Sequence, residues 1–183
     1  MVGLPSGVMT VRSLLADPST SGAWTLDNGR SSVRFTNKTM WGLLKVNGQF
    51  ADVSGSGHIG DDGSVSGRLT IRADSVQTGI GKRDEHLRSP DFFDTGNSPE
   101  IVVEVTGATP SGDRTVDIDA TMTVRGTTLP LPLQATVTGL GNDTIHIVGR
   151  ATVDRTRWGV SGNMAGMMPS TAELVADTTF VKA

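Results

Sequence analysis

The sequence predicts an all-β protein made of antiparallel strands that each have one apolar face. Three observations support this fold class. Glycine is abundant, at 23 of 183 residues, and strand-favouring and turn-favouring residue types are frequent. Apolar and polar residues alternate with a period of two along most of the chain, and turn-forming residues separate the alternating segments. Strands of this kind must pack on a second sheet or close on themselves.

The alternation places about eight strands, beginning near Trp24. The most regular segment is 115–124, where apolar residues from Val116 to Val124 alternate with Thr and Asp. The other segments with this alternation are residues 33–36, 65–73, 101–106, 129–138, 145–153 and 172–181. Each has one face that is suited to a core and one that is suited to water.

Short polar and glycine-containing motifs separate these segments and predict turns. They are NG at 28–29 and 47–48, DDG at 61–63, SGD at 111–113, RGTT at 125–128 and GND at 141–143. In the segment 129–138, Pro130 and Pro132 occupy positions of the polar face. Proline cannot donate to a sheet ladder, so we expect an edge, a bulge or a seam there.

Length and composition fit one domain, which we place at 22–183 after a lead segment, 1–21. The chain has no cysteine, which excludes disulfides and thiolate chemistry. A net charge of −3 gives no basic field, so nucleic acid is not expected as a partner. Residues 1–24 contain no uninterrupted apolar stretch typical of a signal peptide, and no segment has transmembrane length. We therefore expect a cytoplasmic protein.

Residues 80–95 break the strand pattern and predict a short helical insertion. Ser89 is suited to be a helix N-cap and Pro90 the first helical residue, and a shorter turn is expected over 82–88. The i,i+4 spacing of Asp84 and Arg88 predicts an ion pair.

The same segment, GKRDEHLRSPDFFD at 81–94, holds the densest group of charged side chains in the chain. One interpretation is catalytic, with His86 as acid or base assisted by Asp84 or Asp91, but no nucleophile motif surrounds them. Three isolated histidines, at 58, 86 and 146, lack metal-site spacing, so no metal is expected. The alternative is a structural clasp in which Arg83, Asp84 and His86 fix the directions of the neighbouring apolar side chains.

Large apolar residues also gather where the alternation fails. Met40, Trp41 and Leu43 surround Gly42, and Met167 lies in the glycine-rich segment 162–170. Such adaptable side chains are suited to the mouth of a pocket or to a protein interface. The phenylalanines are equally suited to an ordinary core.

These motifs together resemble those of the YceI-like family of polyisoprenoid-binding proteins. The resemblance covers residues 22–182, and its most specific part is the segment 73–94, where a strand ending in T-G is followed by R-D-x-H-L and D-F-F. Further matching segments, in order, are WTLDNGRSSVRF at 24–35, VNGQF at 46–50, MTVRGTTLPLPL at 122–133 and RTRWGV at 155–160. Two positions depart from the family pattern: Trp158 replaces a common Phe, and TNKT at 36–39 replaces a stretch that often carries a histidine.

The resemblance implies a lipocalin-like antiparallel β-barrel of about eight strands that binds a long isoprenoid lipid, of the polyprenyl or isoprenoid quinone type. It implies no catalysis and no cofactor. A function in transport or storage, a transient contact with a membrane and a homodimer are compatible with it. The residues expected to contact the lipid are Phe35, Met40, Trp41, Leu43, Phe50, Ile80, Leu87, Phe92, Phe93, Val103, Met122, Leu133, Trp158 and Met167.

Two alternatives stay open at this stage. One is an enzyme that acts on a hydrophobic substrate through His86 with Asp84 or Asp91. The other is a barrel packed solid with side chains, which binds a protein partner through Met40, Trp41 and Met167.

Overall fold

Backbone pairing closes the predicted strands into a ring. A computed structural model describes residues 9–38, 45–141, 143–162 and 169–183. Eight strands pair antiparallel around the ring, and β1 closes it by pairing with both β4 and β11. In spatial order they are β1 (Gly22–Leu26), β4 (Val53–Ile59), β5 (Val65–Arg72), β7 (Glu100–Pro110), β8 (Thr115–Val124), β9 (Thr127–Gly141), β10 (Thr144–Asp154) and β11 (Thr171–Lys182). The predicted antiparallel barrel is confirmed.

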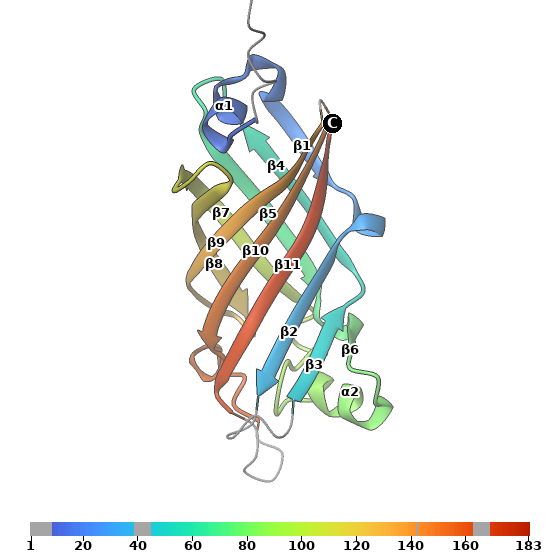
Figure 1. The fold of residues 1–183 in the computed structure, drawn as a ribbon. Coiled ribbons are helices and arrows are strands. Elements are labelled where there is room, and N and C mark those ends of the chain that lie inside the picture. The colour runs from blue at the N-terminus through green and yellow to red at the C-terminus, as the bar shows by residue number, and fades with distance from the viewer. Residues whose placement is uncertain (1–8, 39–44, 142, 163–168) are drawn as a thin grey trace, which may run out of the picture.

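Three further strands lengthen the wall toward one end of the barrel (Figure 1). They are β2 (Ser32–Lys38), β3 (Lys45–Phe50) and β6 (Val76–Gln77). β2 pairs with the same edge of β11 that β1 uses nearer the C-terminus, and β3 then pairs with β2 and β6 with β3. β2, β3 and β6 extend the wall beyond β1, β4 and β5, respectively, and a bend in the chain separates the two strands of each pair.

Two helices lie at opposite ends of the barrel (Figure 1). α1 (Val11–Ala16) belongs to the predicted lead segment, and Thr10 and Ser13 form a capping box at its N-terminus. α2 (Gly81–Arg88) lies beside β6. Short 3₁₀ turns join other elements: η1 (Pro18–Thr20), η2 (Asn28–Arg30), η4 (Ala73–Ser75) and η5 (Arg155–Trp158). Among the described residues, neither helix has the length and apolar character needed to cross a membrane.

The prediction of a helix that starts at Ser89 is wrong. Ser89 is instead the C-cap of α2, and both its N–H and its hydroxyl donate to the carbonyl oxygen of His86. Turns follow, in which the N–H groups of Phe92 and Asp94 donate to the carbonyl oxygen of Ser89. The expected short turn over 82–88 is therefore the helix of this segment, and the expected helix is a series of turns.

The predicted turn at NG 47–48 is also wrong, because both residues lie inside β3. Gly48 pairs with Phe35 of β2. A Cβ at Gly48 would collide with the ring of Phe35, which lies directly over the glycine. Glycine is therefore required here by close packing of an aromatic ring, and not by a reversal of the chain.

Pro130 and Pro132 mark a seam in the barrel wall, as predicted. Both pair with β8, opposite Thr121 and Asp119. The ladder between β9 and β10 ends at Gln134 and Arg150, so the part of β9 that carries the prolines has no ladder with β10. Since proline has no N–H, these positions cannot donate hydrogen bonds across that gap.

Candidate functional site

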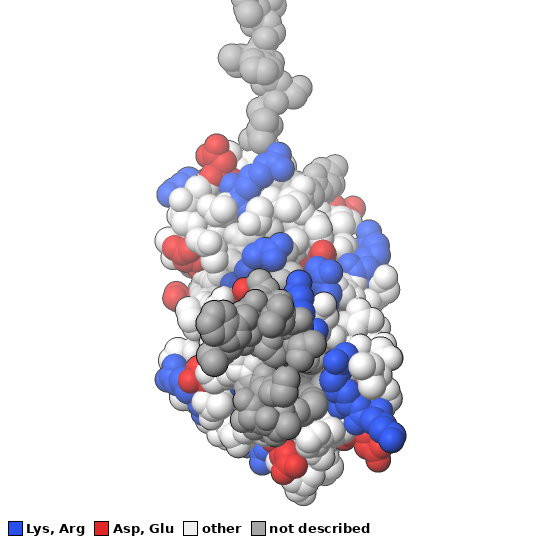
Figure 2. Space-filling model, turned by 60° about the horizontal axis from the view of Figure 1, so that its bottom comes forward, with Lys and Arg blue, Asp and Glu red and all other residues white. Residues whose placement is uncertain are grey.

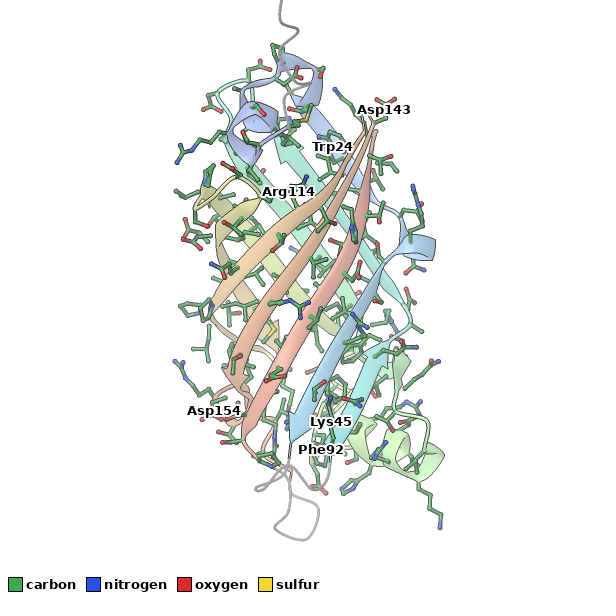
Figure 3. The ribbon with its side chains drawn as sticks, viewed as in Figure 1. Trp24, Lys45, Phe92, Arg114, Asp143 and Asp154 are labelled. Atoms are coloured by element: carbon green, nitrogen blue, oxygen red, sulfur yellow. The ribbon has the colours of Figure 1, made fainter. Side chains whose placement is uncertain are left out.

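Described residues line two apolar cavities in the barrel interior. The α2-end chamber has a volume of about 130 Å³ and is lined by the inward faces of the strands together with the segment that follows α2. The α1-end chamber has a volume of about 200 Å³ and is lined by the opposite halves of the strands together with α1. Figure 3 shows Phe92, from the first chamber, and Trp24, from the second, at opposite ends of the barrel.

The two chambers adjoin at a waist, defined as the five residues that line both. These are Leu69, Val103, Leu133, Gly149 and Ala176. Within the waist Gly149 of β10 pairs with Ala135 of β9 and Ala176 of β11, so three neighbouring strands carry small residues there. Together the chambers form a lumen along the described barrel that side chains do not fill.

Most of the residues predicted to contact a lipid line the α2-end chamber. They are Phe35, Phe50, Leu87, Phe92, Phe93, Val103, Met122, Leu133 and Trp158. Ile80 was also expected among them, but it is 52 % exposed and lines neither chamber. It precedes α2, whose buried side chain is Leu87. Met40, Trp41, Leu43 and Met167 lie outside the described residues.

An aromatic cluster lies in the α2-end chamber. The rings of Phe35, Phe50 and Phe93 contact one another with centroid separations of 5.6–6.3 Å in tilted or edge-to-face arrangements. Trp158 is buried nearby, and its Nε1–H donates to the carbonyl oxygen of Met122 at 2.9 Å. The Trp that replaces the Phe of the family pattern therefore has its polar atom satisfied by the barrel wall.

The clasp, residues 81–94, is fixed to the strand end at Thr78. The carboxylate of Asp84 accepts hydrogen bonds from the backbone N–H and the hydroxyl of Thr78. The guanidinium of Arg83 donates to the hydroxyl and the carbonyl oxygen of the same residue, at 2.9 Å each. In place of the predicted ion pair with Asp84, Arg88 donates to the carbonyl oxygens of Asp74 and Val76.

Phe92 is the most deeply buried residue of the clasp, at 0 % exposure. The ring of His86 contacts it in an edge-to-face arrangement, with centroids 5.1 Å apart, and the guanidinium carbon of Arg155 lies 5.8 Å from the centre of the Phe92 ring. Nε2 of His86 also lies 3.4 Å from a carboxylate oxygen of Asp91. His86 thus contacts Phe92 and Asp91 and lines neither chamber.

Sequence reasoning missed Arg125 as a residue that positions the clasp. Its guanidinium donates to the carbonyl oxygens of Pro90, at 2.6 Å, and Phe92, at 2.8 Å. Arg125 and Gly126 form the two-residue turn between β8 and β9, with positive φ angles of 52° and 76°. Two-residue turns of this kind favour Asn-Gly. The unusual arginine at the first position was therefore the sequence signal that could have indicated a special role for Arg125.

The α2-end chamber has only two polar side chains among its described lining residues, Asn37 and Arg155. Asn37 donates to the carbonyl oxygen of Thr171 at 2.9 Å, and Arg155 donates to the carbonyl oxygens of Pro169 and Val160. Burial lowers the pKa of Arg155, and the neighbouring Asp154 partly offsets this effect. The rest of the lining is apolar or glycine, so the chamber is suited to a hydrocarbon and not to a polar substrate.

Other classes of site find little support in the described residues. They contain no group of three or more His, Cys, Asp or Glu side chains that could hold a metal ion. Seen from the α2 end, basic and acidic side chains are interspersed over the surface (Figure 2). An interspersed surface does not provide the single-sign basic patch that attracts nucleic acid.

The chain is similar to proteins of a known domain family. The YceI-like domain family matches residues 24–182. A UPF0312 protein of Pseudomonas paraeruginosa is 36 % identical over 98 residues, 52 % of this chain and 51 % of the relative. Protein YceI of Escherichia coli O157:H7 is 34 % identical over 98 residues, with the same shares. In these comparisons the chain spans about half the length of the curated relatives it matches.

Two solved structures share the fold. BcnA of Burkholderia cenocepacia superposes with a TM-score of 0.76 at 16 % identity, over 84 % of this chain and 98 % of BcnA. A polyisoprenoid-binding domain of Saccharophagus degradans, implicated in plant cell wall breakdown, superposes with a TM-score of 0.72 at 20 % identity, over 88 % of this chain and 99 % of that domain. Because the family match covers nearly the whole barrel, this chain belongs to the YceI-like family.

Proposed function

We propose that the protein binds one long-chain isoprenoid lipid, of the polyprenyl or isoprenoid quinone type, in the lumen of the barrel, for transport or storage. The observation that carries the proposal is the pair of apolar chambers in the barrel, whose linings share five residues. Two apolar chambers that follow one another in this way are suited to an extended tail that occupies both.

The energetics support this assignment. An apolar void left empty costs about 24 cal/mol per Å³, which is about 5 kcal/mol for the α1-end chamber of about 200 Å³. A ligand tail that fills the void restores the van der Waals contacts that the empty cavity lacks. At about 0.3 kcal/mol per heavy atom, a tail of about forty carbons supplies roughly 12 kcal/mol. This corresponds to about nanomolar affinity without any polar contact.

The class of ligand is supported by the Saccharophagus degradans structure, which is named as a polyisoprenoid-binding domain. The lining of the present barrel fits such a ligand because branched aliphatic and aromatic side chains make up most of it. Methyl-branched isoprene units fill irregular apolar space between side chains of this type.

The proposal treats the protein as a carrier and not as an enzyme. His86 of the competing catalytic interpretation contacts Phe92 and Asp91, outside the lining of both chambers. His86→Ala should therefore change stability or ligand retention. Complete loss of a chemical conversion of the extracted lipid in that variant, with its binding preserved, would favour the enzyme instead.

Native mass spectrometry of the freshly purified protein is the first test, followed by solvent extraction and mass analysis of the released compound. We expect an adduct whose mass matches a polyprenyl chain or an isoprenoid quinone. A bare polypeptide mass that stays unchanged after incubation with isoprenoid quinones would contradict the proposal. The same spectrum reports whether the protein is the expected homodimer.

A pair of substitutions tests whether the α2-end chamber holds the ligand. Phe93→Asp places a carboxylate among the rings of Phe35 and Phe50, and it should abolish lipid retention in a folded protein. Ile80→Asp makes a comparable change at an exposed position before α2 and should leave retention unchanged. Equal retention by both variants would show that the tail does not occupy this chamber.

A further inference from the structure

The α1-end chamber is closed by a segment that precedes the family match. Residues 10–21, the cap segment, contain α1 and η1 and lie before residue 24, where the match begins. Val11 and Leu14 of α1 are 3 % and 5 % exposed, and their side chains pack in a core cluster with Trp24, Ile59 and Val137. With Leu15 they form part of the chamber lining.

Hydrogen bonds fix the cap segment to several parts of the barrel. The N–H of Val11 donates to the carbonyl oxygen of Asp113, between β7 and β8. The indole N–H of Trp24 donates to the carbonyl oxygen of Thr20, whose hydroxyl in turn donates to the carbonyl oxygen of Leu14. At the edge of the segment, Ser21 bonds to Asp61 and Lys182 bonds to Ser19. The cap is therefore held to the β4–β5 turn, the β7–β8 turn and the end of β11.

We propose that Val11 and Leu14 are the stop against which the far end of the lipid tail rests, so that they set the longest tail that the lumen accepts. The inference rests on the proposed function and adds to it the orientation of the lipid in the barrel. An apolar chamber that is closed by apolar side chains cannot satisfy the hydrogen bonds of a polar headgroup. The tail terminus is therefore assigned to the space under α1, and the headgroup to the opposite end of the barrel, beyond the apolar α2-end chamber.

Two opposite changes to the stop test this directly. The double variant Val11→Ala and Leu14→Ala removes as many side-chain carbons as one isoprene unit contains. It should raise the longest retained tail by about one isoprene unit. Leu14→Trp adds bulk at the same place and should lower the limit by a similar step. Arg12→Ala, an exposed change on the same helix, is the matched control and should leave the limit unchanged.

A third variant shortens the lumen without touching α1. Gly57 of β4 pairs with Trp24 and lines the α1-end chamber. A Cβ there would meet only the carbonyl oxygen of Ser66, at an ordinary 3.6 Å. Gly57→Leu should therefore fill the chamber in a folded protein and lower the tail limit. Ser54→Leu on the outer face of the same strand is its control.

The measurement is native mass spectrometry after incubation with isoprenoid quinones that carry increasing numbers of isoprene units. Opposite shifts of the limit in the two α1 variants would support the stop. A lower limit in Gly57→Leu with no shift in either α1 variant would overturn it, since the tail would then reach the chamber but not the cap. Failure of the unaltered protein to retain any quinone, or other polyprenyl lipid, would instead overturn the proposed function.

Discussion

The two ends of the lumen differ in the side chains that line them. The α2-end chamber contains an aromatic cluster within an otherwise mostly aliphatic lining, with three phenylalanine rings in mutual contact and a buried tryptophan, and it has a volume of about 130 Å³. The α1-end chamber is mostly aliphatic, has glycines in its wall and has a volume of about 200 Å³. Aromatic rings fill space and hold a fixed shape, whereas small residues leave room. We infer that the α2-end chamber defines the shape of the space for a ligand and that the α1-end chamber provides the larger volume.

The two ends are also closed in different ways. At the α2 end, arginine side chains donate to backbone carbonyl oxygens of the clasp or of the strands beside it, which fixes where its phenylalanines lie. At the α1 end, a short helix contributes Val11 and Leu14 as an apolar wall. Charge-assisted hydrogen bonds give a defined geometry, and an apolar wall gives a surface that a hydrocarbon can touch. The following predictions test this division.

The largest effect is expected from Phe92→Ala. Phe92 is fully buried between His86 and Arg155, so its removal should lower the free energy of unfolding by about 3–5 kcal/mol. Urea denaturation measures this loss. Phe180→Ala, in the lining of the α1-end chamber, should cost less because its ring is only partly buried and faces a cavity. Equal losses would mean that the two ends do not differ in packing.

Arg125→Asn should have an intermediate effect. Asparagine tolerates the positive φ of this turn, but it cannot reach the carbonyl oxygens of Pro90 and Phe92 as the guanidinium does. Loss of these bonds should lower the free energy of unfolding by about 1–3 kcal/mol. Arg114→Asn makes the same chemical change at an exposed position near the α1 end and should leave it unchanged. If Arg125→Asn is equally neutral, the arginine does not hold the clasp.

Gly149→Leu tests whether the two chambers work as one. A Cβ at Gly149 would lie 3.3 Å from Cδ1 of Leu133, so the larger side chain enters the waist. We expect a cost of about 1–3 kcal/mol from overpacking and a loss of long-tailed lipids in native mass spectrometry. Arg150→Leu, exposed on the same strand, should retain them. Undiminished retention of long tails by Gly149→Leu would show that the ligand does not cross the waist.

The smallest effect is a loosening of the cap segment in acid. Hydrogen bonds from Ser19 lower the pKa of Asp17 below its ordinary value of 3.8, and this residue caps η1. Because the folded-state pKa is the lower one, the contribution of Asp17 is complete above the ordinary value and is lost as pH falls through the folded pKa. Hydrogen exchange of residues 11–21 should rise over that range. Asp17→Asn should remove this pH dependence, and an unchanged dependence would assign it to other groups.

Sequence periodicity identified most of the wall, because burial of every second residue leaves a readable pattern. The segment 115–124 became β8 with its apolar positions inward, and Pro130 and Pro132 marked a real seam. Local motifs were less reliable where contacts between distant residues determine the local structure. The NG at 47–48 resembles a turn, yet it lies in a strand under the ring of Phe35, and Ile80 resembles a lining residue, yet it faces solvent.

The sequence by itself determined an antiparallel barrel, an apolar interior, the family and the importance of residues 81–94, since these depend on alternation and on motifs that are local in the chain. Tertiary structure alone decided that the lumen has two chambers and a waist, that Arg125 holds the clasp from a turn more than thirty residues away, and that residues 10–21 close the far end. These features depend on which distant residues the closed ring brings together. Because closure of the ring, and not periodicity, sets those contacts, no local pattern could indicate them.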